Sequence, residues 1–308
     1  LSGPATLRPL TAGVPPISLK PGKAVRLRKD ARSDLGVNVS ASAPELFEFN
    51  GDDSADQLVV TREYVDLVSS AGPIAYWRFE NLDARLVRNE AGAKHDLQLL
   101  GDGVRIARQN GNGRAVFTIG DSTARFVSSD TFDELAGRDY ALEFWFKPSH
   151  YHRGVLASLV EHANDEQGSV ERHGLILEIH SASPAPEGLE GRPKTIRYLH
   201  RSPPHELLTG TSIYSAHEYK PHVWQHVAAV KQGDQMQLFV DGELVAAGTD
   251  KTGLTAGLSL VVGQLFTFGT VRPFVGEIDE LAVYDRALSL DDLKQRVQLV
   301  RVPSSDAR

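Results

Sequence analysis

The clearest alternation of apolar and polar positions lies in residues 224–247, which read WQHVAAVKQGDQMQLFVDGELVAA. Gly233-Asp234 and Asp241-Gly242 divide this stretch into three short runs. An Asp-Gly pair suits a tight hairpin turn because both positions tolerate a positive φ. Period-two alternation without helical spacing predicts an antiparallel three-stranded meander with a buried face. Three strands cannot bury that face alone, so we expect the rest of the chain to supply a covering sheet.

Similar alternation recurs from residue 74 to residue 288. The segments are 74–80, 114–119, 122–127, 140–148, 155–161, 174–181, 258–265 and 274–288. In segment 140–148, Leu142 and Phe144 share one face and Trp145 lies on the other, and we expect Trp145 and Phe239 to be buried. About a dozen strands at such spacing predict an all-β fold, an antiparallel β-sandwich or jelly roll. The absence of helical crossovers excludes a parallel α/β fold.

Two helices are expected beside the strands. The first covers residues 54–70, because Ser54 and Gln57 form a capping-box pattern and Gly72-Pro73 stops the helix. The second is short and C-terminal, starting at Ser289 and ending before Val302-Pro303. Residues 54–302 therefore form the main domain.

Residues 1–53 have a different character, rich in proline and glycine. We interpret them as a small β appendage or as the remnant of a preceding domain. Residues 17–27, ISLKPGKAVRL, predict a hairpin around Pro21-Gly22, and residues 45–50 predict a further strand. The first residue is Leu1, which favours a piece of a longer polypeptide.

The amino-acid composition excludes several classes of function. The chain has 308 residues and no cysteine, which excludes thiol catalysis, zinc-thiolate sites and disulfides. Its net charge of −7, with interspersed signs, argues against a nucleic-acid partner. No apolar run approaches the ~20 residues of a membrane span, so we expect no membrane insertion by this fragment.

Four blocks in order resemble LamG-like jelly-roll domains of the concanavalin A-like lectin/glucanase superfamily. They are AYWRFE at 75–80, YALEFWFKP at 140–148, the 224–248 meander, and FVGEIDELAVYDRALSLDDL at 274–293. The resemblance spans residues 64–300 and implies a concanavalin A-like sandwich, an architecture that hosts lectins, enzymes and adhesive spacers. The family's Asp-x-Ser-Gly loop after the first strand is replaced here by Asn89-Glu90-Ala91-Gly92. Separately, residues 17–27 resemble the repeats at the end of FecR-type periplasmic sensor domains.

The segment EIDEL at 277–281 resembles the three-carboxylate strand of family-16 glycoside hydrolases. Glu277 and Asp279 fit that pattern, but the third position falls on Leu281 or Ala282. Alternation along a strand points Glu280 to the other face. We therefore expect no catalytic residues.

The resemblance also implies one structural Ca²⁺ at the rim of the sandwich. Glu80 leaves the first strand at this rim, and Asp279 belongs to the final block beside it. Calcium takes six to eight oxygen ligands, and carbonyls of residues 88–93 would complete the shell. We expect Glu80 and Asp279 to be the metal ligands, or else Asp279 to pair with Arg78.

The favoured hypothesis is a non-catalytic recognition or adhesion module of a larger extracytoplasmic protein, periplasmic or on the cell surface. It would bind a glycan or a cell-surface protein through loops 161–173 and 182–194, which are long and polar. The alternatives are a glycan-active hydrolase and a structural spacer without a ligand. The pairs His150/His152 and His222/His226 lack a third zinc ligand, so we expect satisfied or surface histidines.

Overall fold

The structure is a computed structural model that describes four short N-terminal strands and residues 57–109, 111–118, 123–165, 168–184, 191–204 and 209–300. The chain divides into two compact units, Leu1–Ser54 and Ala55–Arg308. In the first, β1 (Ala5–Leu7) pairs with β2 (Ile17–Leu19), and β3 (Arg26–Lys29) pairs with β4 (Val37–Ser40). The predicted hairpin over 17–27 is therefore wrong, because alternation marks strands without fixing their partners. The strand expected at 45–50 lies outside the described residues.

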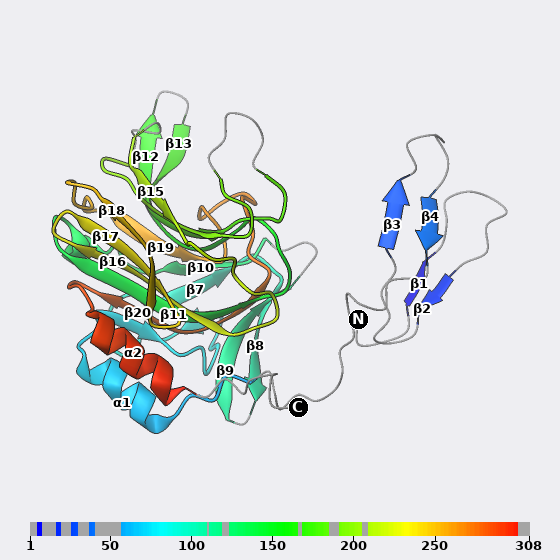
Figure 1. The fold of residues 1–308 in the computed structure, drawn as a ribbon, viewed down its shortest axis with the longest axis horizontal. Coiled ribbons are helices and arrows are strands. Elements are labelled where there is room, and N and C mark those ends of the chain that lie inside the picture. Colours follow the sequence, from blue (N-terminus) through cyan, green and yellow to red (C-terminus); the bar gives the residue numbers. More distant parts are fainter. Residues whose placement is uncertain are drawn as a thin grey trace. The chain divides into compact units, whose positions relative to one another are not determined.

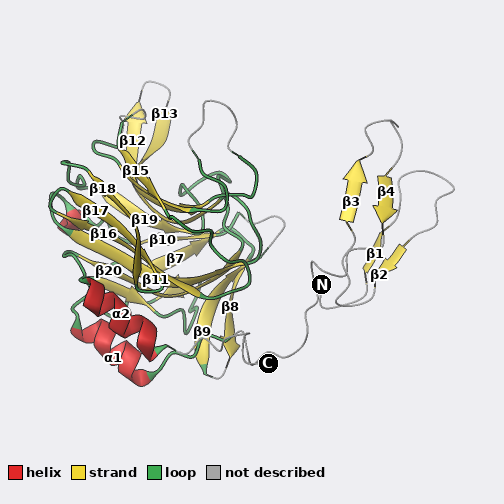
Figure 2. Cartoon of the chain, viewed as in Figure 1, coloured by secondary structure: helices red, strands yellow, loops and turns green. Residues whose placement is uncertain are grey.

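The second unit is a sandwich of two eight-stranded antiparallel sheets (Figures 1 and 2). We call one the helix sheet, with the order β18-β17-β16-β11-β20-β9-β8 and β5 paired to β20. Its strands are β5 (Ala75–Trp77), β8 (Val104–Gln109), β9 (Asn112–Phe117), β11 (Tyr140–Pro148), β16 (Gln225–Gln232), β17 (Gln235–Val240), β18 (Glu243–Thr249) and β20 (Gly276–Tyr284).

The other sheet, the second sheet, has the order β15-β14-β13-β12-β19-β10-β7-β6. Its strands are β6 (Leu86–Val87), β7 (Leu97–Leu100), β10 (Arg125–Ser128), β12 (Gly154–Asp165), β13 (Gly168–Ile179), β14 (Ile196–His200), β15 (Thr211–Tyr214) and β19 (Leu258–Val262). The predicted all-β sandwich is confirmed, with about 46% of the structure in strands.

Alternation along β11 shows how the strands fill the layers. Leu142, Phe144 and Phe146 pack into the core between the two sheets. Trp145 points the other way, where it packs with Phe239 under the helices. Both side chains are at most 2% exposed, as predicted. β11 therefore contributes side chains to two apolar layers.

Two helices cover the outer face of the helix sheet (Figure 2): α1 (Arg62–Ser70) and α2 (Leu290–Leu299). The predicted start of α2 at Ser289 is confirmed, since Ser289 is its N-cap and forms a capping box with Asp292. The predicted start of the first helix at residue 54 is wrong. The side chain of Thr61 accepts a hydrogen bond from the Tyr64 N–H, so the helix begins one turn beyond Leu58.

The predicted meander is confirmed in β16, β17 and β18. Its second turn places Asp241 at φ +50° and Gly242 at φ +75°, as a type I′ turn requires. Among the described residues, no helix is long and apolar enough to cross a membrane.

The predicted loop 161–173 is wrong, because most of it continues β12 and β13 as a long hairpin (Figure 1). The polar sequence HANDE misled the prediction. In a hairpin that extends beyond the facing sheet, cross-strand hydrogen bonds satisfy the backbone. No apolar layer covers the side chains there, so a polar sequence can form these strands.

Candidate functional site

The structure brings Glu80 and Asp279, the predicted metal ligands, to the same end of β9. The Glu80 carboxylate accepts from the Gly113 N–H at 3.0 Å, and the neighbouring Asn112 Nδ2 donates to Asp279 at 2.7 Å. Glu80 also pairs with Arg78 at 3.2 Å. The alternative prediction of an Asp279–Arg78 pair is not what forms, since Arg78 bonds Glu80 and Glu280.

A β-bulge places Glu280 beside Asp279 on the outer face of the helix sheet. Along β11, Glu143 faces Ala282 but Trp145 faces Asp279, so β20 holds one extra residue, and Glu280 adopts φ +53°. The prediction that Glu280 points to the other face is therefore wrong. Strict alternation fails where a strand carries a bulge, and the sequence EIDEL holds no glycine or proline to signal it.

Glu80, Asp279 and Glu280, which we call the acidic cluster, hold more negative charge than Arg78 offsets. Glu280 accepts from Tyr76 Oη and from Arg78 Nε. Burial raises the pKa of Glu280 to about 7, although Arg78 and the bonds from Tyr76 and Arg78 oppose the rise. Burial and the charge of Glu280 raise the pKa of Asp279 well above its usual range. The cluster is thus poor in positive charge.

The three carboxylates on β20 are not open to solvent as glycosidase catalysts are. Asp279 and Glu280 have no exposed surface. Glu277 pairs with Arg114 and, at 3.4 Å, with Lys147. Among the described residues, no three acidic or histidine side chains converge on a common metal position.

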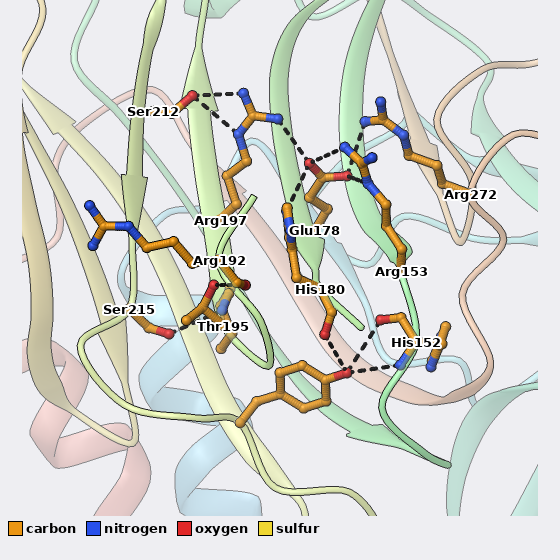
Figure 3. A network of polar contacts seen from close by, with 12 residues as sticks. His152, Arg153, Glu178, His180, Arg192, Thr195, Arg197, Ser212, Ser215 and Arg272 are labelled. Carbon is orange, nitrogen blue, oxygen red and sulfur yellow. Dashed lines mark hydrogen bonds and ion pairs between the residues drawn. The ribbon is translucent and has the colours of Figure 1, made fainter. Parts of the chain in front are cut away.

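A second polar network lies on the outer face of the second sheet (Figure 3). Its centre is Glu178 on β13, which is fully buried. Arg197 Nη1 donates to Glu178 Oε1 at 3.0 Å, and Arg272 Nη1 donates to Oε2 at 3.0 Å. Arg153 approaches both oxygens at 3.5 Å, and the His180 ring lies 3.2 Å from Oε1. We call Arg153, Arg197 and Arg272 the arginine cluster.

The register between neighbouring strands aligns the residues of this network. Val155, Glu178, Arg197 and Tyr214 lie directly opposite one another across β12, β13, β14 and β15, so they form one row on the outer face. Arg153 precedes β12. Arg272 arrives from the segment after β19 and is held by a 2.9 Å bond from the Val155 N–H to its carbonyl.

The pKa of Glu178 is shifted in the opposite direction to the pKa of Glu280. Burial acts to raise the pKa of Glu178, but the bond to His180 and the charges of Arg272 and Arg153 hold the pKa well below its usual range. The charge of Arg272 also acts on His173. Burial lowers the pKa of His173 to about 3, with the charges of Arg201 and Arg272 acting in the same direction. Sequence analysis missed this cluster because its arginines lie far apart in the chain and belong to no motif.

The remaining candidates have structural explanations. His226 is fully buried and bonds Glu143 at 3.1 Å, and the His152 ring accepts from the Val275 N–H at 3.0 Å. His152 is therefore a satisfied histidine, as predicted, whereas the buried Nδ1 of His226 has no hydrogen-bond partner among the described residues. Of the predicted loop 182–194, residues 185–190 lie outside the described ranges.

A cavity of about 240 Å³ opens at the edge of the sandwich, beside the segment after β15. The polar side chains of His217, Glu218, Lys220, Asp241 and Glu243 line it together with Val240 and Val245. Asp241 accepts from the His226 N–H at 2.8 Å, so part of this lining has a structural role. The cavity is the second concave candidate for a ligand.

Comparison with known proteins places the fold. The sequence model of a family described as the concanavalin A-like lectin/glucanases superfamily (Laminin_G_3) matches residues 120–294. No curated protein sequence matches the chain. The FecR resemblance of residues 17–27 lies outside the matched range and stays a prediction.

Among solved structures, the chain is similar to domain 4 of AbnA, a GH43 extracellular arabinanase of Geobacillus stearothermophilus, in complex with arabinotriose. The identity is 18% and the TM-score 0.52, covering 73% of this chain and 98% of that domain. It is also similar to the binding domain of botulinum neurotoxin DC, in structures with SialylT and with rat synaptotagmin II. There the identity is 10% and the TM-score 0.53, covering 75% of this chain and 52% of the neurotoxin chain. At such identities these likenesses show the fold.

Proposed function

Because this chain belongs to the concanavalin A-like lectin/glucanase superfamily, we propose that it is a non-catalytic recognition module that binds a saccharide on the outer face of the second sheet. The observation that carries the proposal is the polar row Glu178, Arg197 and Tyr214 on a sheet face that neither α1 nor α2 covers. Fixed polar groups beside an aromatic ring suit sugar hydroxyls and sugar rings.

The burial of the β20 carboxylates supports a non-catalytic role. A retaining glycosidase needs two carboxyl groups that flank the substrate, whereas Asp279 and Glu280 have no exposed surface and Glu277 is engaged with Arg114 and Lys147. The hydrolase alternative would require these groups to open to solvent together.

The structural neighbours also support binding. One is in complex with arabinotriose and another with SialylT, and both are β-sandwiches of this superfamily's fold. The neurotoxin complex with synaptotagmin II keeps a protein partner as the alternative ligand. We place the module outside the cytoplasm, as part of a longer protein, since the arabinanase neighbour is extracellular.

A glycan array tests the proposal. We expect binding that Tyr214→Ala abolishes, because this half-buried ring ends the polar row. Leu244→Ala, an exposed apolar residue on β18, is the control and should bind as the wild type does. Loss of binding with Glu243→Gln but not with Tyr214→Ala would move the site to the 240 Å³ cavity. No binding to any glycan would overturn the proposal.

Turnover of a polysaccharide panel separates the module from a hydrolase. We expect none. Hydrolysis that disappears with Glu277→Gln or Asp279→Asn would show an enzyme instead.

We further propose that the acidic cluster holds a structural Ca²⁺ between Glu80 and Asp279. The donor set fits in chemistry: two carboxylates stand beside the buried Oδ1 of Asn112, which has no hydrogen-bond partner. Amide and carboxylate oxygens are the ligands that calcium prefers. Bound calcium would offset the negative charge that Arg78 leaves unbalanced.

A further inference from the structure

The arginine cluster contains more positive charge than its carboxylate balances. Arg153 and Arg272 both pair with one acid, Glu178, which Arg197 also bonds, and among the described residues no second carboxylate lies close enough to bond Arg153 or Arg272. Burial together with Arg153 and Arg197 lowers the pKa of Arg272, which Glu178 only partly opposes. Arg153 and Arg272 therefore exceed the charge of Glu178 by about one positive charge, before Arg197 is counted.

Another buried carboxylate of this protein shows what a balanced network is. Under α2, Glu143 is fully buried and pairs with Arg296 at 2.8 Å, also fully buried, and with His226. There one arginine serves one carboxylate, and a helix covers both. The arginine cluster differs in both respects, since its charges are unmatched and its rim is open: the side chains of Arg153 and Arg272 are 27% and 30% exposed.

The donors left over belong to the two arginines at the rim. All three nitrogens of Arg197 are engaged, because Nε and Nη2 donate to Ser212 Oγ and Nη1 donates to Glu178. Arg272 bonds only through Nη1, so its Nε and Nη2 have no partner among the described residues. Arg153 Nε is buried without a hydrogen bond, and its contacts to Glu178 are long at 3.5 Å. A guanidinium has five donors in a fixed fork.

The two rim arginines are held in place before any ligand arrives. Glu178 binds both guanidinium groups, and the bond from the Val155 N–H ties the Arg272 backbone, itself at φ +53°, to β12. Groups ordered in advance lose little entropy when they bind. An anion that reached them would gain charge-assisted hydrogen bonds at little ordering cost.

From this geometry we infer that the saccharide recognised by the second sheet is acidic, with a sugar carboxylate bound by Arg153 and Arg272 beside Glu178. This inference rests on the proposed function and names its ligand class. A planar carboxylate matches the paired donors of a guanidinium, which favours uronic acid-type sugars over sulfated ones. Tyr214, at the far end of the row, would contact the neighbouring sugar.

Calorimetric titration with matched oligosaccharides tests the inference. We would compare an oligogalacturonate, its methyl ester, and a sulfated neutral oligosaccharide of equal length. We expect the oligogalacturonate to bind at least about tenfold more tightly than its methyl ester, since bonds to charged groups exceed neutral ones. Added salt should weaken this binding, because the charges lie at the rim.

Matched variants assign the effect to the rim arginines. Arg272→Gln and Arg153→Gln should each reduce oligogalacturonate affinity by about tenfold or more and leave the methyl ester's affinity unchanged. Arg153→Lys keeps the charge but loses the fork, so a loss with this variant supports planar recognition even if a glutamine variant fails to fold. Arg62→Gln on α1, whose side chain is 90% exposed, is the control and should have no effect.

The outcomes separate the inference from the proposed function. Equal binding of the ester and the acid, abolished by Tyr214→Ala, would overturn the acidic ligand and keep the saccharide module. Tighter binding of the sulfated sugar would overturn the carboxylate assignment. A glycan array without any binding would remove both.

Discussion

On the helix sheet, Asp279 and Glu280 lie beside one arginine, Arg78, which pairs with Glu280 but not with Asp279, whereas on the second sheet one carboxylate, Glu178, faces three. All three acids are fully buried. Burial acts in the same direction on each, yet the pKa of Glu280 rises to about 7 and that of Glu178 falls well below its usual range. The balance of neighbouring charges, and not burial, decides the sign of the shift.

The same comparison distinguishes a buried ion pair that stabilises the fold from clusters whose unbalanced charge can bind a ligand. Glu143 and Arg296 neutralise each other one to one, and α2 carries Arg296 over the carboxylate. The acidic cluster lacks positive charge and the arginine cluster lacks negative charge. A cation on the first and an acidic sugar on the second would each restore the balance that the protein leaves incomplete.

The largest expected effect is on stability and concerns the face of the helix sheet that α1 and α2 cover. Trp145→Ala should reduce the free energy of unfolding by about 3–5 kcal/mol, because the ring is 1% exposed and packs beneath α1 and α2. Denaturant unfolding measures it. A loss below ~1 kcal/mol would mean that the helices do not seal this face.

The next prediction compares the two carboxylates directly. Glu178→Gln should cost about 3 kcal/mol, because it removes the charge of the carboxylate that three partly buried guanidinium groups contact. Glu280→Gln should cost about 1 kcal/mol or less, since it relieves repulsion with Asp279 while Arg78 keeps Glu80. Equal losses in parallel denaturant titrations would contradict the contrast between the two clusters.

The pH dependence of stability sharpens the same contrast. The folded pKa of Glu178 is depressed, so its stabilisation is fully present above the ordinary value near 4.5 and is lost as pH falls toward the folded value. The stability difference between the wild type and Glu178→Gln should therefore shrink by about 2 kcal/mol as pH falls from 6 to 3. Unfolding curves across this range check it, and a difference that grew on acidification would reverse the assigned shift.

Particular residues show how far the sequence could lead. The alternation in 140–148 and 224–247 predicts four strands of the helix sheet, and the burial of Trp145 and Phe239, because a strand's period of two is a local property. The bulge at Glu280 and the meeting of Arg153, Arg197 and Arg272 were not predictable. Each depends on register between strands that are distant in sequence, which no local pattern records.

The smallest expected effect concerns calcium on the acidic cluster. If Ca²⁺ binds the folded state alone between Glu80 and Asp279, stability must rise by RT ln(1 + [L]/Kd), about 1.4 kcal/mol at ten times Kd. The melting temperature in millimolar calcium should therefore exceed that in excess chelator. Asp279→Ala should abolish the rise, because it removes a carboxylate that no neighbour replaces. Arg272→Gln is the matched control on the other sheet and should keep it, since its guanidinium bonds Glu178 instead. An unchanged melting temperature would end the calcium proposal, and the negative charge of Asp279 and Glu280 would then be met by bound protons, as their raised pKa values allow.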